Sequence, residues 1–156
     1  MRIRIIWIGK TKNLPIRTLS ADYLERIRCL VPCEVFETRD ISKARGLRGA
    51  DLLMAEGTEI ARFLPKACRT IVLDELGTQL ASVEFARWFE TEQNRGTREL
   101  AFIIGGPEGL SQQISGGAYL RLSLGKMTWT HEMCRVLLLE QIYRAYSILQ
   151  KIPYHR

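Results

Sequence analysis

The chain has 156 residues, 46% hydrophobic and 26% charged, a composition typical of one globular domain with its own core. No apolar run approaches the roughly 20 residues of a membrane helix, and the start lacks a signal-peptide pattern, so we expect a cytoplasmic protein without a membrane partner. The net charge of +6 arises from residues 1–50, where 11 Lys or Arg face 5 Asp or Glu; this fits an RNA partner and a solvated basic surface equally well.

Hydrophobic periodicity predicts alternating strands and helices in the first half of the chain. The strands have β-branched, alternating sequences and the helices carry apolar side chains at helical spacing. In chain order we expect a strand at 2–8, a helix at 19–30, a strand at 34–38 and a helix at 50–64. The polar, basic stretch 39–49 contains Gly46 and Gly49, which predicts a loop.

The second half continues the alternation. We expect strands at 70–74, 100–104 and 118–124, and helices at 82–94, 111–114 and 131–150. Ser82 is the predicted N-cap of its helix, with Glu84 in the first turn. Five strands that alternate with helices predict one α/β domain over residues 1–156, with a mostly parallel sheet covered on both faces.

Three predicted strand ends have the sequence of a ligand site. They read LDELG at 73–77, GGPEG at 105–109 and LGKMT at 124–128. Ligands of parallel sheets bind beyond the carboxyl ends of the strands, and neither a P-loop nor a dinucleotide fingerprint is present. We therefore expect backbone groups and apolar walls from Leu73, Ile103, Leu124 and Met127 to hold an adenosine group without a phosphate. The alternative is that the glycine turn is only structural.

The helix predicted at 131–150 is apolar on more than one face, so it must be buried on several sides. Either a second protomer or the rest of one chain could cover it. Glu140 and Arg144 have the spacing of an ion pair. Arg135 follows His131 by one turn, which suits either a role in substrate binding and catalysis or a structural salt bridge.

The tail and the cysteines allow simpler interpretations. Tyr154 could stack on a base and Arg156 could contact a phosphate, but a C-terminus of this kind can also fray. The four cysteines have no CxxC spacing and no histidine companions, so we expect reduced thiols and no metal site.

Several motifs in the same order resemble a known family. The segments IIGGPEGLS at 103–111, LSLGKMTWTHEMCRVLLLEQIYRAYSILQ at 122–150 and the terminal PYHR are similar to bacterial SPOUT methyltransferases of the RlmH type. One difference is Thr130, where that family has proline; threonine can still serve as the N-cap of the helix.

This resemblance implies a C-terminal trefoil knot, a homodimer, and methylation of N3 of a pseudouridine in 23S rRNA within the ribosome. It further implies that S-adenosyl-L-methionine binds in the knot, with the tail near the cofactor pocket. The implied cofactor contacts are Leu73, Gly105, Leu124, Gly125, Lys126, Met127, Thr128 and Trp129.

Methylation at N3 requires removal of a proton from a weak acid, by a general base or with the help of a cation. His131 and His155 are the candidate bases, and Arg135 or Arg156 could stabilise the developing anion. Two other classes of function stay open. The chain could be a non-catalytic RNA-binding module with a structural glycine turn, or a small-molecule enzyme that uses a nucleotide.

Overall fold

The structure is a computed structural model that describes residues 1–42 and 46–154. The strands are β1 (Arg2–Ile8), β2 (Cys33–Thr38), β3 (Arg69–Gln79), β4 (Glu99–Ile104) and β5 (Leu120–Ser123). The helices are α1 (Leu14–Arg28), α3 (Gly49–Ala61), α4 (Ser82–Asn94), α5 (Gln112–Gly116) and α6 (His131–Leu149). The centre of the predicted 39–49 loop and the last two residues, His155 and Arg156, lie outside the described residues.

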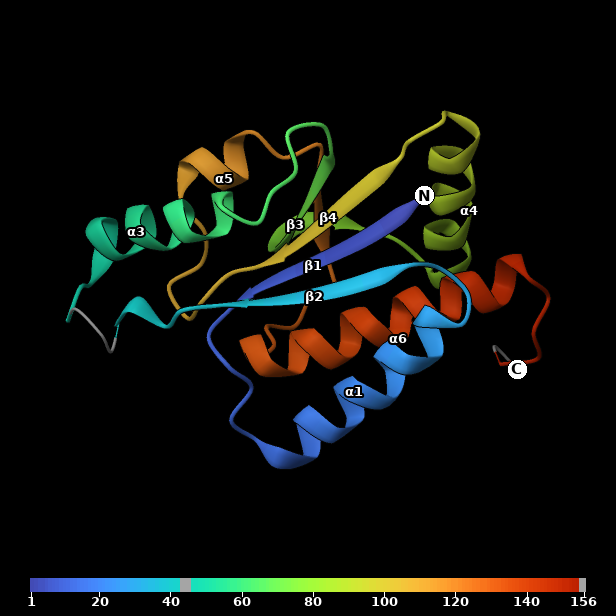
Figure 1. Ribbon diagram of the computed structural model, residues 1–156, viewed down its shortest axis with the longest axis horizontal. Helices are drawn as coiled ribbons and strands as arrows, with labels where there is room; N and C mark the ends of the chain where they lie inside the picture. The colour runs from blue at the N-terminus through green and yellow to red at the C-terminus, as the bar shows by residue number, and fades with distance from the viewer. Residues whose placement is uncertain (43–45, 155–156) are drawn as a thin grey trace.

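The five strands form one parallel sheet in the order β2-β1-β4-β3-β5 (Figure 1). The predicted α/β class is therefore confirmed. β4 lies in the middle, and its apolar sequence ELAFII is buried on both faces, as expected for a central parallel strand. After β3 the chain turns inward to β4, and after β4 it crosses outward to β5. Because the direction reverses there, a crevice opens at the carboxyl ends of these strands.

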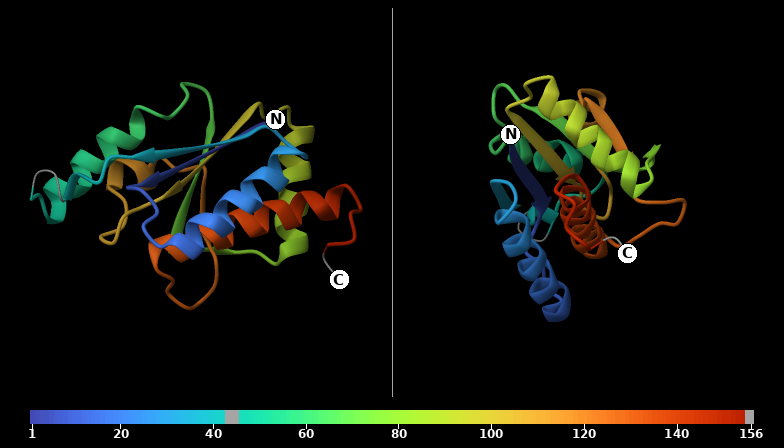
Figure 2. Two further views of the ribbon diagram at one scale, coloured as in Figure 1. Left: turned by 60° about the horizontal axis from the view of Figure 1, so that its bottom comes forward. Right: turned by 90° about the vertical axis from the view of Figure 1, so that its right-hand side faces the viewer.

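Helices cover both faces of the sheet (Figures 1 and 2). The alternation of side chains along β1 sends Ile3 and Ile5 into a core with α1, α4 and α6. Ile6 points the opposite way, into a smaller core with Ile60 of α3 and Ile114 of α5. No helix among the described residues is both long and apolar enough to cross a membrane.

α6 lies between α1 and α4 against the sheet (Figure 2), which explains its apolar sequence. Leu138, Leu139 and Ile142 are fully buried within this one chain. The packing inside the chain thus accounts for the fully buried side of α6, while Met133, Leu137 and Tyr143 stay partly exposed. Thr130 caps the helix, because its hydroxyl accepts the Met133 N–H at 3.3 Å.

The start of α1 and the N-cap of α4 differ from the prediction. α1 begins five residues early, since the Asn13 side chain accepts the Ile16 N–H at 3.1 Å and provides an N-cap that the apolar spacing does not reveal. At α4 the N-cap is Ala81 and not Ser82. The Glu84 carboxylate accepts the Ala81 N–H at 2.7 Å, and this charge-assisted bond closes the first turn.

β3 is longer than predicted and contains a large bulge. Leu73 and Thr78 both pair with Leu122, so residues 74–77 are extruded from the ladder. Gly77 lies against β5, where a Cβ atom would be 2.7 Å from the Arg121 carbonyl carbon. Only glycine permits this close approach, and what looked like a strand end is a projection from a continuous strand.

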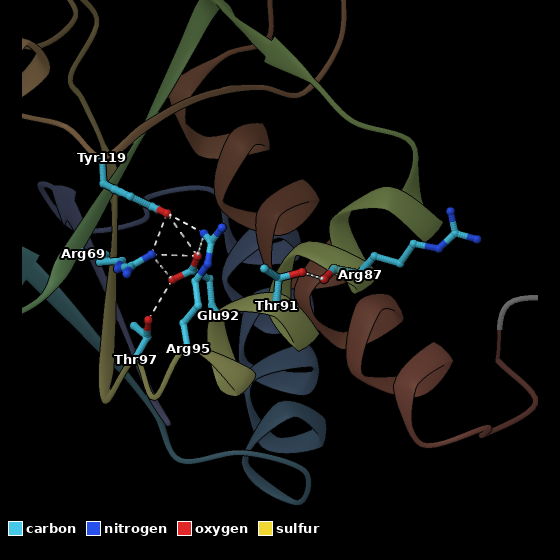
Figure 3. A network of polar contacts seen from close by, with 7 residues as sticks. All are labelled: Arg69, Arg87, Thr91, Glu92, Arg95, Thr97 and Tyr119. Carbon is cyan, nitrogen blue, oxygen red and sulfur yellow. Dashed lines mark hydrogen bonds and ion pairs between the residues drawn. The ribbon is translucent and has the colours of Figure 1, made fainter.

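A buried carboxylate links the beginnings of three neighbouring strands (Figure 3). Glu92, fully buried at the end of α4, accepts bonds from Arg69 at 2.6 and 2.8 Å and from Thr97 at 2.7 Å. The Tyr119 hydroxyl donates to it at 3.1 Å. Because these partners stand at the beginnings of β3, β4 and β5, the network fixes three strands whose other ends form the cavity described next.

Candidate functional site

A cavity of about 930 Å³ opens at the carboxyl ends of β3, β4 and β5. Its walls come from the β3 bulge, from the segment 104–110 that follows β4, and from the segment 121–131 that leads from β5 into α6. The structure thus brings together the three segments that the sequence pattern singles out.

Most residues of the predicted cofactor set line this cavity. They are Leu73, Gly105, Leu124, Gly125, Met127, Thr128 and Trp129. Lys126 belongs to the same run but is exposed and does not line the cavity. Ile103, a predicted wall, is fully buried in the core beneath the site, and its neighbour Ile104 takes that place in the wall.

Glycine is required in the segment Gly105–Gly109, here called the glycine loop. A Cβ atom at Gly105 would lie 2.5 Å from the Gly109 carbonyl oxygen, and Gly109 itself has φ of +89°. Both positions exclude a side chain, the first by contact and the second by backbone conformation. The loop therefore turns back on itself and presents its backbone to the cavity.

Three carboxylates contribute charge to the cavity that the motifs alone do not predict. Asp74, Glu75 and Glu108 line the cavity, although all three stand inside the motifs LDELG and GGPEG. Arg121 is the one Lys or Arg side chain among the described lining residues, and it is paired with Asp74 at 2.6 Å. Thr128 donates to Glu75 at 3.2 Å and joins two walls of the cavity.

These contacts set the charge of the site. Burial raises the pKa of Asp74, but the Leu76 N–H and the Arg121 guanidinium outweigh it and hold the pKa below its ordinary value. Asp74 is thus ionised at neutral pH, and the cavity contains three carboxyl side chains, Asp74, Glu75 and Glu108, but one guanidinium among its described lining residues. Such a lining repels a phosphate and favours a ligand that carries positive charge and hydroxyl groups.

His131, the first residue of α6, also lines the cavity. Burial lowers the pKa of its imidazole, and the positive charge of Arg135 lowers it further. The ring is therefore neutral at pH 7 and able to accept a proton. Cys134, one turn along, lines the same wall as a free thiol.

Arg135 points away from the cavity and toward β1. Its side chain is buried and donates 2.7 Å hydrogen bonds to the Thr11 hydroxyl and the Ile8 carbonyl oxygen. The guanidinium stacks over Trp7 at 4.9 Å. Glu132 holds the same β1–α1 loop, since its carboxylate accepts the Lys12 N–H at 2.8 Å.

Tyr154 also lies outside the cavity. Its hydroxyl is 3.0 Å from that of Tyr23 and donates to Glu140 at 3.2 Å. Arg144 pairs with Glu140 as the spacing predicts, with its Nε 2.9 Å from the carboxylate. The described part of the tail thus packs on α1 and α6, while His155 and Arg156 lie outside the described residues.

Comparison with known proteins shows similarity to one family over nearly the whole chain. The family described as "Predicted SPOUT methyltransferase" matches residues 1–155. The chain is 39% identical over 155 residues to the ribosomal RNA large subunit methyltransferase H of Citrifermentans bemidjiense, and 36% identical over the same length to the Bacteroides fragilis protein of that name. Each alignment covers 99% of both proteins.

Two solved structures share the fold. A probable methyltransferase from Bordetella pertussis Tohama I superposes with a TM-score of 0.58 at 12% identity, over 93% of this chain and 96% of that one. A probable methylase family protein from Haemophilus influenzae gives 0.54 at 11% identity, over 99% of this chain and 70% of the other. At such identities the likeness concerns the fold alone.

Proposed function

The chain belongs to the SPOUT methyltransferase family, and on that premise we propose that it transfers a methyl group from S-adenosyl-L-methionine to N3 of a pseudouridine in 23S rRNA within the ribosome. The relatives named ribosomal RNA large subunit methyltransferase H support the choice of RNA. The observation that carries the proposal is the carboxylate-lined cavity at the ends of β3, β4 and β5.

The lining suits this cofactor. S-adenosyl-L-methionine carries a sulfonium, an ammonium group and ribose hydroxyls, for which carboxylates are suitable partners, and it has no phosphate. Leu73, the glycine loop and the run 124–129 would hold it, with Lys126 contributing backbone only. When bound, the cofactor supplies an electrophilic methyl group. The protein then has to align the acceptor and remove its proton.

His131 is the base that the geometry favours. A neutral imidazole at the cavity wall can take the N3 proton of the pseudouridine as the methyl group is transferred. Arg135 acts on this step as a positioning residue, because it keeps His131 neutral through its charge and fixes the adjoining loop. His155 stays a second candidate base, and Tyr154 and Arg156 stay candidates for RNA binding.

Three basic side chains from the first 50 residues stand near the carboxyl ends of the strands, where the cavity also lies. Lys10 follows β1 and Arg39 follows β2, and both are exposed. Arg48 precedes α3 and is exposed as well. Because parallel strands end at the same side of the sheet, these cations flank the site on the side of β1 and β2 and would contact RNA phosphates. RNA affinity should therefore fall steeply with salt concentration.

We expect a homodimer in the cytoplasm, built from one SPOUT domain per chain with a C-terminal trefoil knot. Leu76, Met127 and Trp129 at the cavity are 82%, 74% and 41% exposed, and a second protomer would cover them. Substitution of Leu76 by Glu should shift the protein from dimer to monomer in sedimentation experiments. Sedimentation of the unaltered chain as a monomer at micromolar concentration would refute the dimer.

The test of the function uses methyl-labelled S-adenosyl-L-methionine with assembled ribosomes, isolated large subunits and free 23S rRNA in parallel. We expect label in one RNA nucleoside, identified as N3-methylpseudouridine by mass spectrometry. Calorimetry with the unlabelled cofactor separates the alternatives. RNA binding without cofactor uptake would support a binding module, and cofactor uptake without label in any RNA would support a small-molecule enzyme.

A further inference from the structure

The glycine loop and the segment that follows it rest on α3 through two contacts. The Glu108 carboxylate accepts the N–H of Gly49, the first residue of α3, at 2.8 Å. Beyond the loop, Ser111 packs on Gly57, where a Cβ atom would lie 2.6 Å from the serine hydroxyl oxygen. The position of the loop relative to the cavity is thus set by α3, which does not line the cavity itself.

Glu56 lies between these two contacts. It is 4% exposed and occupies the buried stripe of α3 together with Leu52 and Ile60. Its carboxyl oxygens are 3.2 and 3.3 Å from the point where a Cβ atom of Gly106 would be. Within the part of the chain that the structure describes, no side chain or backbone N–H forms a hydrogen bond or ion pair with this carboxyl group, and the glycine loop packs directly on it.

Among the described residues, the two charges that act on Glu56 most strongly are negative. Asp40 approaches from the end of β2 and Glu108 from the glycine loop itself. Burial, followed by these two charges, raises the pKa of Glu56 to about 7. Lys12 neutralises part of Asp40, with the two side chains 3.6 Å apart. Ionisation of Glu56 therefore places a new negative charge beside Glu108, a member of the loop, and repels it.

We propose that Glu56 is a positioning residue for the glycine loop. As a neutral acid it lets the loop dock on α3, and its ionisation displaces the loop and weakens cofactor binding. The inference rests on the proposed function, since it assumes that the cavity takes S-adenosyl-L-methionine. It adds a residue from a helix outside the cavity and couples the site to pH.

The pH dependence of the cofactor Kd follows from the fraction of molecules in which the glycine loop is docked on α3. The apparent Kd equals the intrinsic Kd divided by that fraction, so the Kd of the unaltered protein rises as pH increases through about 7. Glu56→Gln keeps the shape of the side chain but cannot ionise, so its Kd should not change over that range. Glu56→Ala loses the packing against Gly106 and should bind weakly at every pH.

The experiment measures the Kd of S-adenosylhomocysteine by calorimetry at pH 6 and pH 8.5. We expect a rise of about fivefold in the unaltered protein and less than about twofold in Glu56→Gln. Glu59→Gln is the matched control, because Glu59 is on the same helix but pairs with Arg62 outside the loop contact. It should behave as the unaltered protein does.

The same Kd measurement with S-adenosyl-L-methionine distinguishes docking of the glycine loop from direct attraction between an ionised Glu56 and the sulfonium. Docking changes the Kd of both ligands by the same factor, whereas an ionised Glu56 that attracted the sulfonium would tighten binding of the methyl donor alone. Parallel pH curves for the unaltered protein and Glu56→Gln would overturn the inference and leave the proposed function intact. Absence of binding at every pH in all variants would instead remove the proposed function.

Amide hydrogen exchange of the cofactor-free protein gives a second readout that needs no ligand. After correction for the intrinsic effect of pH on exchange, residues 105–109 should open more at pH 8.5 than at pH 6, and Glu56→Gln should abolish that difference. Equal protection of the loop at both pH values in the unaltered protein would contradict the displacement step.

Discussion

Arg135 of α6 donates a 2.7 Å hydrogen bond to the Ile8 carbonyl oxygen at the end of β1, so the last helix is tied to the first strand of the chain. Among the described residues no carboxylate forms an ion pair with this buried guanidinium, although Glu132 and Glu37 act on it from a distance, so its burial is costly. Here two neutral acceptors and the Trp7 ring offset part of this cost. The same cation acts on His131, one turn away, and lowers the pKa of its imidazole.

Replacement of Arg135 by Met should therefore raise the pKa of His131. Methionine fills a similar volume but removes the charge that disfavours imidazolium, while the effect of burial remains. Titration of the His131 ring by NMR measures the shift. Lys12→Met is the control, since Lys12 lowers the same pKa more weakly than Arg135 and should give a smaller change. An unchanged His131 titration in the Arg135 variant would contradict this coupling.

The glycine loop provides a test of the cofactor site. Gly105→Ala should abolish measurable cofactor binding, because the new methyl group would lie 2.5 Å from the Gly109 carbonyl oxygen and open the loop. Calorimetry with S-adenosylhomocysteine gives the comparison. Gly96→Ala is the matched control: it strains a positive φ of +74° in open space after α4, and should lose about 1 kcal/mol of stability but no binding. Full affinity in Gly105→Ala would refute the site.

The Glu92 network predicts how stability changes in acid. Burial raises the Glu92 pKa, but bonds from Thr97 and Tyr119 and the charge of Arg69 outweigh it, so the net pKa is below its ordinary value. The carboxylate therefore adds stability at pH values above about 4.5, and this contribution is lost as pH falls through the depressed pKa.

Glu92→Gln should lower the free energy of unfolding at pH 7 by about 2 to 3 kcal/mol and flatten its dependence on pH below 5. Urea titrations at several pH values measure both effects. Glu59→Gln breaks an exposed pair with Arg62 and should cost less than about 1 kcal/mol. An equal loss of unfolding free energy in the two variants would show that burial of the Glu92 carboxylate does not strengthen its contribution to stability.

Local sequence patterns predict the elements better than the contacts between them. The run LAFII predicts a strand because its apolar residues are continuous, and the structure confirms that strand. Glu56 offers a weaker signal, a glutamate four residues from both Leu52 and Ile60 in a buried stripe. The sequence cannot show that Gly106 packs on it, since Gly106 lies 50 positions further along the chain, beyond strands β3 and β4. The same holds for Arg135, whose acceptors Ile8 and Thr11 come from the other end of the chain.

His131 gives the sharpest test of the chemistry. A base must be neutral to accept the proton, so at saturating cofactor the rate should rise with pH through the His131 pKa and level off above it. That pKa lies below the ordinary value because burial and Arg135 disfavour the charged ring. Replacement of His131 by Asn should reduce kcat about 100-fold and change the cofactor Kd by less than about threefold.

Single-turnover methyl transfer to ribosomes, measured from pH 5 to pH 9, distinguishes the two candidate bases. If His131 is the base, the acid limb of the profile disappears in His131→Asn and persists in His155→Asn. The opposite pattern would assign the proton transfer to His155, in the tail. Full activity in both single variants would remove histidine from the mechanism. Glu56→Gln serves as the background for these measurements, because it separates the titration of the base from the pH dependence of cofactor binding.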